Sequence, residues 1–157
     1  MDTPADHRWN MCMKDWLQLL RVSNAPTCVT NVLVGCLIGI ASLPPEFPGP
    51  FVDPLAVVLV LGGVFGFYFG GMALNDVLDV KRDRLSGAPR PIACGRIGRT
   101  PAAIAAVCLL GGGLTGVAFA AGTPGLLAGC GLLACIVAYD CWHGSTWPAV
   151  LLMGLCR

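Results

Sequence analysis

Long apolar stretches separated by short polar ones dominate the chain. Four of them approach the roughly 20 residues that a helix needs to cross a bilayer. These stretches are 26–43, 54–74, 101–121 and 125–139. A fifth begins at Trp147 and reaches only Cys156. The pattern predicts an all-α fold, a polytopic transmembrane helical bundle with four full helices and a truncated fifth.

Glycines are concentrated within the second and third apolar stretches. Small residues allow membrane helices to approach one another closely. Helix packing is therefore the preferred interpretation of these glycines, although they would also leave room for a flat or elongated ligand. The residues concerned are Gly62, Gly63, Gly66, Gly70, Gly71, Gly111, Gly112, Gly113 and Gly116.

The composition agrees with a multi-pass integral membrane protein. Of the 157 residues, 55% are hydrophobic and only 12% are charged, whereas soluble domains are about 25% charged. The net charge of +1 gives no reason to expect a nucleic-acid partner. The nine cysteines lie largely in apolar stretches, where cysteine behaves as a small hydrophobic residue.

The positions of lysine and arginine predict the orientation. Three basic residues precede the first apolar stretch, and six lie between the second and third. The loops at 44–53 and 122–124 contain none. The positive-inside rule then places the N-terminal segment 1–24 and the aspartate-rich loop in the cytoplasm.

Four oxygen-bearing side chains follow the second apolar stretch, at Asn75, Asp76, Asp79 and Asp83. If the helix continues, a turn of 100° per residue places all four on one face. Arg82 then lies within i+3 reach of Asp79. Lys81 and Arg84 fall on the opposite side.

Carboxylate and amide oxygens without a nearby histidine or thiolate suit Mg²⁺, which shares its remaining positions with phosphate oxygens. Four arginines could then meet the phosphate charge. They are Arg82, Arg84, Arg90 and Arg96. The alternative is an ordinary juxtamembrane helix end, which is charged because it is in contact with water.

The same residues resemble a known family. The pattern N-D-x-x-D-x-x-x-D over 75–83, followed by R-P-I-A-C-G-R-I over 90–97, is similar to the first aspartate-rich motif of the UbiA family of intramembrane prenyltransferases. Residues 20–27 resemble the opening of that family. Tyr139-Asp140 and Met153-Gly154-Leu155 resemble the region between its fourth and fifth helices.

The resemblance implies a helical bundle with a lipid-facing cavity, in which Mg²⁺ and an isoprenyl diphosphate are held and the prenyl group is transferred to a lipophilic, often aromatic, acceptor. Carried over by position, Asn75, Asp79 and Asp83 form the metal-binding side, with Asp76 beside them. Asp79, Asp83 and Arg82 are the implied catalytic residues. The implied substrate contacts are Arg21, Asn75, Arg82 and Arg90.

No second aspartate-rich motif follows Asp83, and Asp140 stands alone. We therefore expect residues 1–157 to be the N-terminal part of a single UbiA-like domain, which would be inactive by itself. An inactive remnant or a small non-enzymatic membrane protein is the alternative. A CDP-alcohol phosphatidyltransferase is rejected because its motif needs an Asp-Gly pair. The acceptor and the prenyl length stay open.

Overall fold

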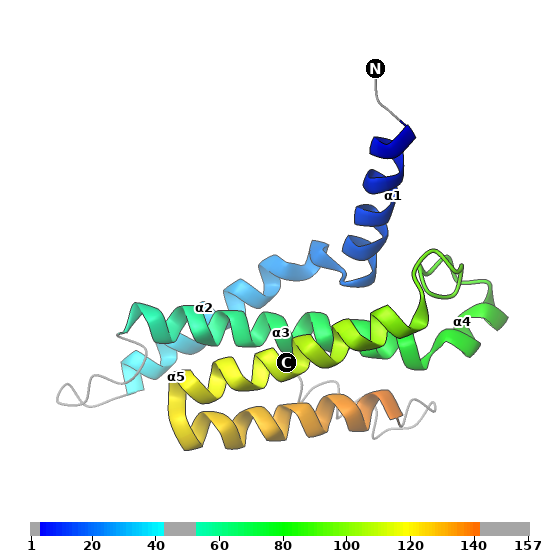
Figure 1. The fold of residues 1–157 in the computed structure, drawn as a ribbon. Helices are drawn as coiled ribbons and strands as arrows, with labels where there is room; N and C mark the ends of the chain where they lie inside the picture. Colours follow the sequence, from blue (N-terminus) through cyan, green and yellow to red (C-terminus); the bar gives the residue numbers. More distant parts are fainter. Residues whose placement is uncertain (1–3, 43–52, 142–157) are drawn as a thin grey trace.

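The computed structural model describes residues 4–42 and 53–141, and these residues form helices and short connections without a strand (Figure 1). In chain order they are α1 (Pro4–Leu19), the 3₁₀ helix η1 (Val22–Asn24), α2 (Ala25–Ser42), α3 (Pro54–Leu78), α4 (Val80–Ser86) and α5 (Arg99–Cys141). The predicted all-α fold is confirmed. The expected partial helix from Trp147 lies outside the described residues.

Three helical segments are long and apolar enough to cross a membrane: Val22–Ser42, Pro54–Leu78 and Arg99–Asp140. The last contains 42 residues, which at 1.5 Å per residue is about 63 Å, or two bilayer widths. The chain reverses at Gly122, whose φ of 60° and ψ of −144° are not helical. Figure 1 shows the two arms of α5 lying side by side. The stretches 101–121 and 125–139 are thus two passes, as predicted.

Many large apolar side chains point outward from these helices. Leu37, Val107, Phe119 and Leu127 are each more than 60% exposed. Such a surface is expected for side chains that face lipid, because a soluble monomer rarely exposes large contiguous apolar patches. The protein is an integral membrane protein.

The helix α3 begins at a defined signal. The Asp53 side chain accepts a hydrogen bond from the Leu55 N–H at 3.0 Å, and Pro54 occupies the first turn. An acidic N-cap followed by proline satisfies or removes amide donors that a helix start leaves unpaired.

Glycines bring α3 into close contact with the first arm of α5. A Cβ atom added at Gly66 would lie 2.6 Å from the Leu109 carbonyl oxygen, and one added at Gly113 would lie 2.8 Å from the Gly63 carbonyl oxygen. Backbones this close leave no space for a side chain or a ligand. Gly62, Gly111 and Gly112 have nothing within 4 Å and lie off this seam. Packing is therefore the role of the seam glycines.

The helix after 75 is not straight through the aspartates, in contrast to the prediction. The helix α3 ends at Leu78 and α4 begins at Val80, with Asp79 as the joint at φ −82° and ψ 1°. Backbone hydrogen bonds still run from the Asp79 N–H to the Asn75 carbonyl and from the Asp83 N–H to the Asp79 carbonyl, each 2.9 Å. The helical hydrogen-bond pattern thus continues across the joint.

Candidate functional site

Two buried aspartates at the end of α3 and in α4 share one arginine. Nη1 of Arg90 lies 2.7 Å from Oδ1 of Asp76 and 3.3 Å from Oδ2 of Asp83. The side chains of Asp76 and Asp83 are only 4% and 7% exposed. Buried carboxylates need such a partner because an unpaired charge away from water is costly. Asn75, one residue before this cluster, is buried as well.

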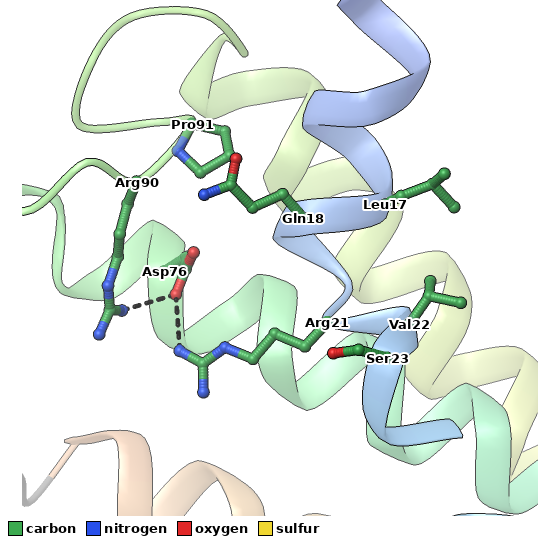
Figure 2. A pocket seen from close by; sticks show the side chains of 8 residues that line it. All are labelled: Leu17, Gln18, Arg21, Val22, Ser23, Asp76, Arg90 and Pro91. Atoms are coloured by element: carbon green, nitrogen blue, oxygen red, sulfur yellow. Dashed lines mark hydrogen bonds and ion pairs between the residues drawn. The ribbon is translucent and has the colours of Figure 1, made fainter. Parts of the chain in front are cut away.

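A second arginine reaches Asp76 from the start of the first membrane pass. Nη2 of Arg21 lies 3.5 Å from Oδ1 of Asp76, and Figure 2 shows Arg21 and Arg90 meeting at this carboxylate. The backbone of Arg21 has a φ of 49°, a left-handed conformation that is unfavourable for residues with a side chain. The Tyr68 hydroxyl donates a hydrogen bond to the Arg21 carbonyl at 3.3 Å, which ties this turn to α3.

The 87–98 loop holds Arg90 in place. Its residues Pro91, Ile92 and Ile97 are buried, and the two isoleucines pack with Leu19 and Val77 in the core at this end of the bundle. The N–H groups of Arg96 and Ile97 both donate to the Pro91 carbonyl. Apolar anchors on both sides of a hydrogen-bonded turn make this loop a rigid support. The R-P-I-A-C-G-R-I sequence is thereby explained in structural terms.

The N-terminal helix α1 docks on the same loop through Arg96. Nη1 of Arg96 lies 3.2 Å from Oδ1 of Asp15, and its Nη2 donates to Oε1 of Gln18 at 3.3 Å. The Gln18 amide in turn donates to the Pro89 carbonyl. Arg96 therefore holds α1 against the loop. Arg84 is also engaged, because its Nε donates to the Ala93 carbonyl at 3.3 Å.

A cavity of about 580 Å³ opens where α1, η1, the end of α3 and the loop meet. Arg21, Gln18, Ser23, Asp76 and Arg90 are among the residues that line it (Figure 2). Its wall combines two guanidinium groups with one buried carboxylate. A cavity with this lining is suited to an anionic group.

Asp79 forms an ion pair with a different arginine from the one that Asp76 and Asp83 share. Its Oδ1 is 3.8 Å from Nη1 of Arg82, an i,i+3 pair in which the arginine is mostly exposed. Lys81 and Arg84 are exposed, as the helical phase predicted. Asp76 and Asp83 therefore share Arg90, while Asp79 pairs with Arg82.

Sequence reasoning missed the position of Asp140 at the end of α5. Asp140 is 8% exposed, and its Oδ2 has no hydrogen-bond partner within the part of the chain that the structure describes. The second arm of α5 packs along α3, with Ile136 beside Gly71, so Asp140 and Asp79 lie at the same end of the bundle. The only sequence signal was an acidic residue at the end of an otherwise apolar stretch.

We tested whether these residues suit a divalent cation. Within residues 12–42 and 53–140, no three acidic, histidine or cysteine side chains are grouped closely enough to bind a metal. Asp76 and Asp83 share Arg90 as their ion-pair partner, while Asp79 and Asp140 lie at the same end of the bundle, where α3 and the second arm of α5 pack together. Mg²⁺ is commonly held by one or two carboxylates together with substrate phosphates. The oxygen donors around Asp79 therefore fit this ion.

Comparison with known proteins identifies the family of this chain. A search of curated protein sequences gives no match. One solved structure, described as giving insights into digeranylgeranylglyceryl phosphate synthase in membranes, has a TM-score of 0.69 and 27% sequence identity. The match covers 82% of this chain and 43% of that protein, so this chain spans less than half of its relative. The description of the UbiA prenyltransferase family matches residues 32–157. With these residues and the helical membrane fold, the chain belongs to the UbiA prenyltransferase family.

Proposed function

We propose that this protein transfers an isoprenyl group from an isoprenyl diphosphate to a lipophilic or aromatic acceptor within the membrane, and that the transfer depends on Mg²⁺. The observation that carries the proposal is the group of buried aspartates and half-buried arginines where the apolar helix α3 ends. Family membership and the prenyl-lipid synthase among its structural relatives support the same reaction.

The proposed metal-binding side consists of Asn75, Asp79 and Asp83, with Asp76 beside them. Bound Mg²⁺ would offset the negative charge that builds up on the diphosphate as its C–O bond breaks. The carboxylates project from α3, α4 and the joint between them, whose positions are fixed by packing against the 87–98 loop. A site whose ligands are held rigidly loses little free energy in reorganisation when the substrate binds.

Arg21, Arg82 and Arg90 are the proposed contacts of the diphosphate. Both ion pairs of Arg90 use Nη1, so its Nε and Nη2 can serve a phosphate while Asp76 keeps its partner. Arg21 makes the longer contact to Asp76 and lines the cavity. Arg82 extends from α4 next to Asp79. Together these guanidinium groups would bind and orient the leaving group.

The apolar surroundings would protect the reacting carbon. An allylic cation reacts with water if water is present, and an apolar site excludes it. The cytoplasmic orientation of the aspartates, part of the same proposal, would allow a water-soluble diphosphate head to reach the site while the prenyl chain stays in lipid. The acceptor's nucleophilic carbon or oxygen then forms the new bond.

Because residues 1–157 span less than half of the solved relative, the test uses membranes that contain the full-length natural protein. It measures prenyl transfer with a radiolabelled isoprenyl diphosphate and a panel of lipophilic and aromatic acceptors. We expect a labelled lipophilic product with Mg²⁺ and none with EDTA. Diphosphate binding without any product would instead identify an inactive family member. Product formation that is equal in EDTA would contradict the proposed role of Mg²⁺.

A further inference from the structure

The buried carboxylate of Asp140 has no role in the proposed set of ligands. Only 8% of the surface of Asp140 is exposed. Its Oδ2 atom lacks a hydrogen-bond partner among the described residues. None of the described arginines or lysines forms an ion pair with it. A carboxylate in such a place needs a positive partner to stay charged.

Helix packing explains why Asp140 lies near Asp79. A Cβ atom added at Gly71 would be 3.3 Å from Cγ2 of Ile136, and one added at Gly129 would be 3.5 Å from the Phe67 ring. The second arm of α5 therefore runs along α3 in the same direction. Asp140 follows Ile136 by about one helical turn, and Asp79 follows Gly71 by about two. Both carboxylates thus reach the same end of the bundle.

Two negative charges placed together without a shared cation repel each other. The pair between Asp79 and Arg82 is long, at 3.8 Å, and its arginine is exposed. The donors available here are carboxylate oxygens from two different helices. This donor set suits a hard divalent cation that completes its shell with water and phosphate oxygens.

We propose that Asp140 is a further metal-binding residue, which acts with Asp79 to hold a divalent cation between α5 and the α3–α4 joint. This inference rests on the proposed function, because it concerns the same cation. It differs from the proposed function because it assigns one metal-binding carboxylate, that of Asp140, to α5, which lies outside the aspartate-rich motif. The cation would then link the second arm of α5 to α3, so metal binding would also stabilise the bundle.

The experiment is a titration with Mn²⁺, a spectroscopic substitute for Mg²⁺, followed by electron paramagnetic resonance on the purified protein without diphosphate. Loss of a residue that only hydrogen-bonds a metal ligand already lowers metal affinity by about 10- to 100-fold. We therefore expect Asp140→Asn to weaken Mn²⁺ binding at least about tenfold. Asp140→Glu, which retains a carboxylate, should recover part of the affinity. Asp53→Asn is the matched control, because asparagine also caps helices and position 53 lies at the opposite end of α3.

Thermal unfolding gives a second measurement. In EDTA, Asp140→Asn should melt no lower than the unchanged protein, since it removes a buried charge and its repulsion with Asp79. Mn²⁺ should raise the melting temperature of the unchanged protein and of Asp53→Asn, but not that of Asp140→Asn.

Asp79→Asn separates the possible failures. If Asp79→Asn loses Mn²⁺ binding while Asp140→Asn binds as the unchanged protein does, the role of Asp140 is refuted and the proposed function stands. If both variants bind Mn²⁺ normally, the metal-binding role of Asp79 in the proposed function is refuted as well. A lower melting temperature of Asp140→Asn in EDTA, with normal Mn²⁺ affinity, would make Asp140 a structural residue and would also overturn the inference.

Discussion

At the scale of single residues, Arg90 joins the two buried aspartates of the candidate site. Its Nη1 is shared by Asp76 and Asp83, which lie on either side of the joint at Asp79. The guanidinium therefore stabilises two buried carboxylates and fixes α4 relative to α3. Because it also lines the cavity, the same side chain connects the stability of the fold with the recognition of an anion.

Replacement of Arg90 should therefore reduce stability as well as substrate binding. Loss of one partner of a buried ion pair costs about 3–5 kcal/mol, and the partial exposure of Arg90 lowers our expectation for Arg90→Ala to about 2–3 kcal/mol. Arg90→Lys should recover only part of this, because an ammonium group lacks the planar fork of the guanidinium. The measurement is the free energy of unfolding in mixed micelles. An Arg90→Ala protein as stable as Arg84→Ala would contradict this account.

The sequence singled out these residues but not the contacts between them. The motif indicated Asn75, Asp76, Asp79, Asp83 and Arg90. Helical-phase arithmetic then assumed one continuous helix, so it could not show that α3 ends at Leu78 and that α4 begins at Val80. Asp140 was missed for a different reason. Its burial depends on how α5 packs against α3, which local sequence does not encode.

At the scale of helices, the seam between α3 and α5 depends on the absence of side chains. We expect Gly66→Ala to destabilise the protein by about 1–3 kcal/mol, as overpacking of a close-packed core does, because the added Cβ would meet the Leu109 carbonyl and Gly113. Gly62→Ala is the matched control, since a Cβ there meets nothing within 4 Å. It should leave stability unchanged or slightly higher. Equal melting temperatures for the two variants would refute the packing role.

The reversal within α5 depends on Gly122 in a similar way. Its backbone angles lie close to a region that only glycine adopts readily, and a side chain there costs about 1–3 kcal/mol. We predict that Gly122→Ala lowers the free energy of unfolding by about this amount, although no atom lies within 4 Å of its Cβ position. Gly112→Ala, in the regular first arm, should have little effect. If both substitutions prove harmless, the turn does not require glycine.

The apolar pattern predicted the membrane helices well, because each must satisfy its backbone hydrogen bonds within itself. It did not predict α1, which the sequence presented only as a polar segment. The contacts of Asp15 and Gln18 with Arg96 hold the end of α1 on the 87–98 loop. These residues are 78 or more positions apart in the chain, so short-range patterns could not reveal the contact.

At the scale of the whole molecule, orientation decides which compartment supplies the substrate. The exposed Cys94 lies in the 87–98 loop, beside the basic residues that predict a cytoplasmic location. In a variant that retains only this cysteine, a membrane-impermeant maleimide should label inside-out vesicles and not right-side-out ones. Labelling of intact right-side-out vesicles would reverse the proposed topology.

The central claim is that the end of α3 and its joint with α4 hold an isoprenyl diphosphate with the help of Mg²⁺. The most direct test is the Mg²⁺-dependent binding of a radiolabelled isoprenyl diphosphate to the purified protein, compared among the unchanged protein, Asp79→Ala and Lys81→Ala. Lys81 is exposed two residues away and takes no part in the proposed site. We predict that Asp79→Ala abolishes the Mg²⁺-dependent part of binding and that Lys81→Ala retains it. Equal binding by all three proteins, or binding that EDTA does not change, would contradict the claim.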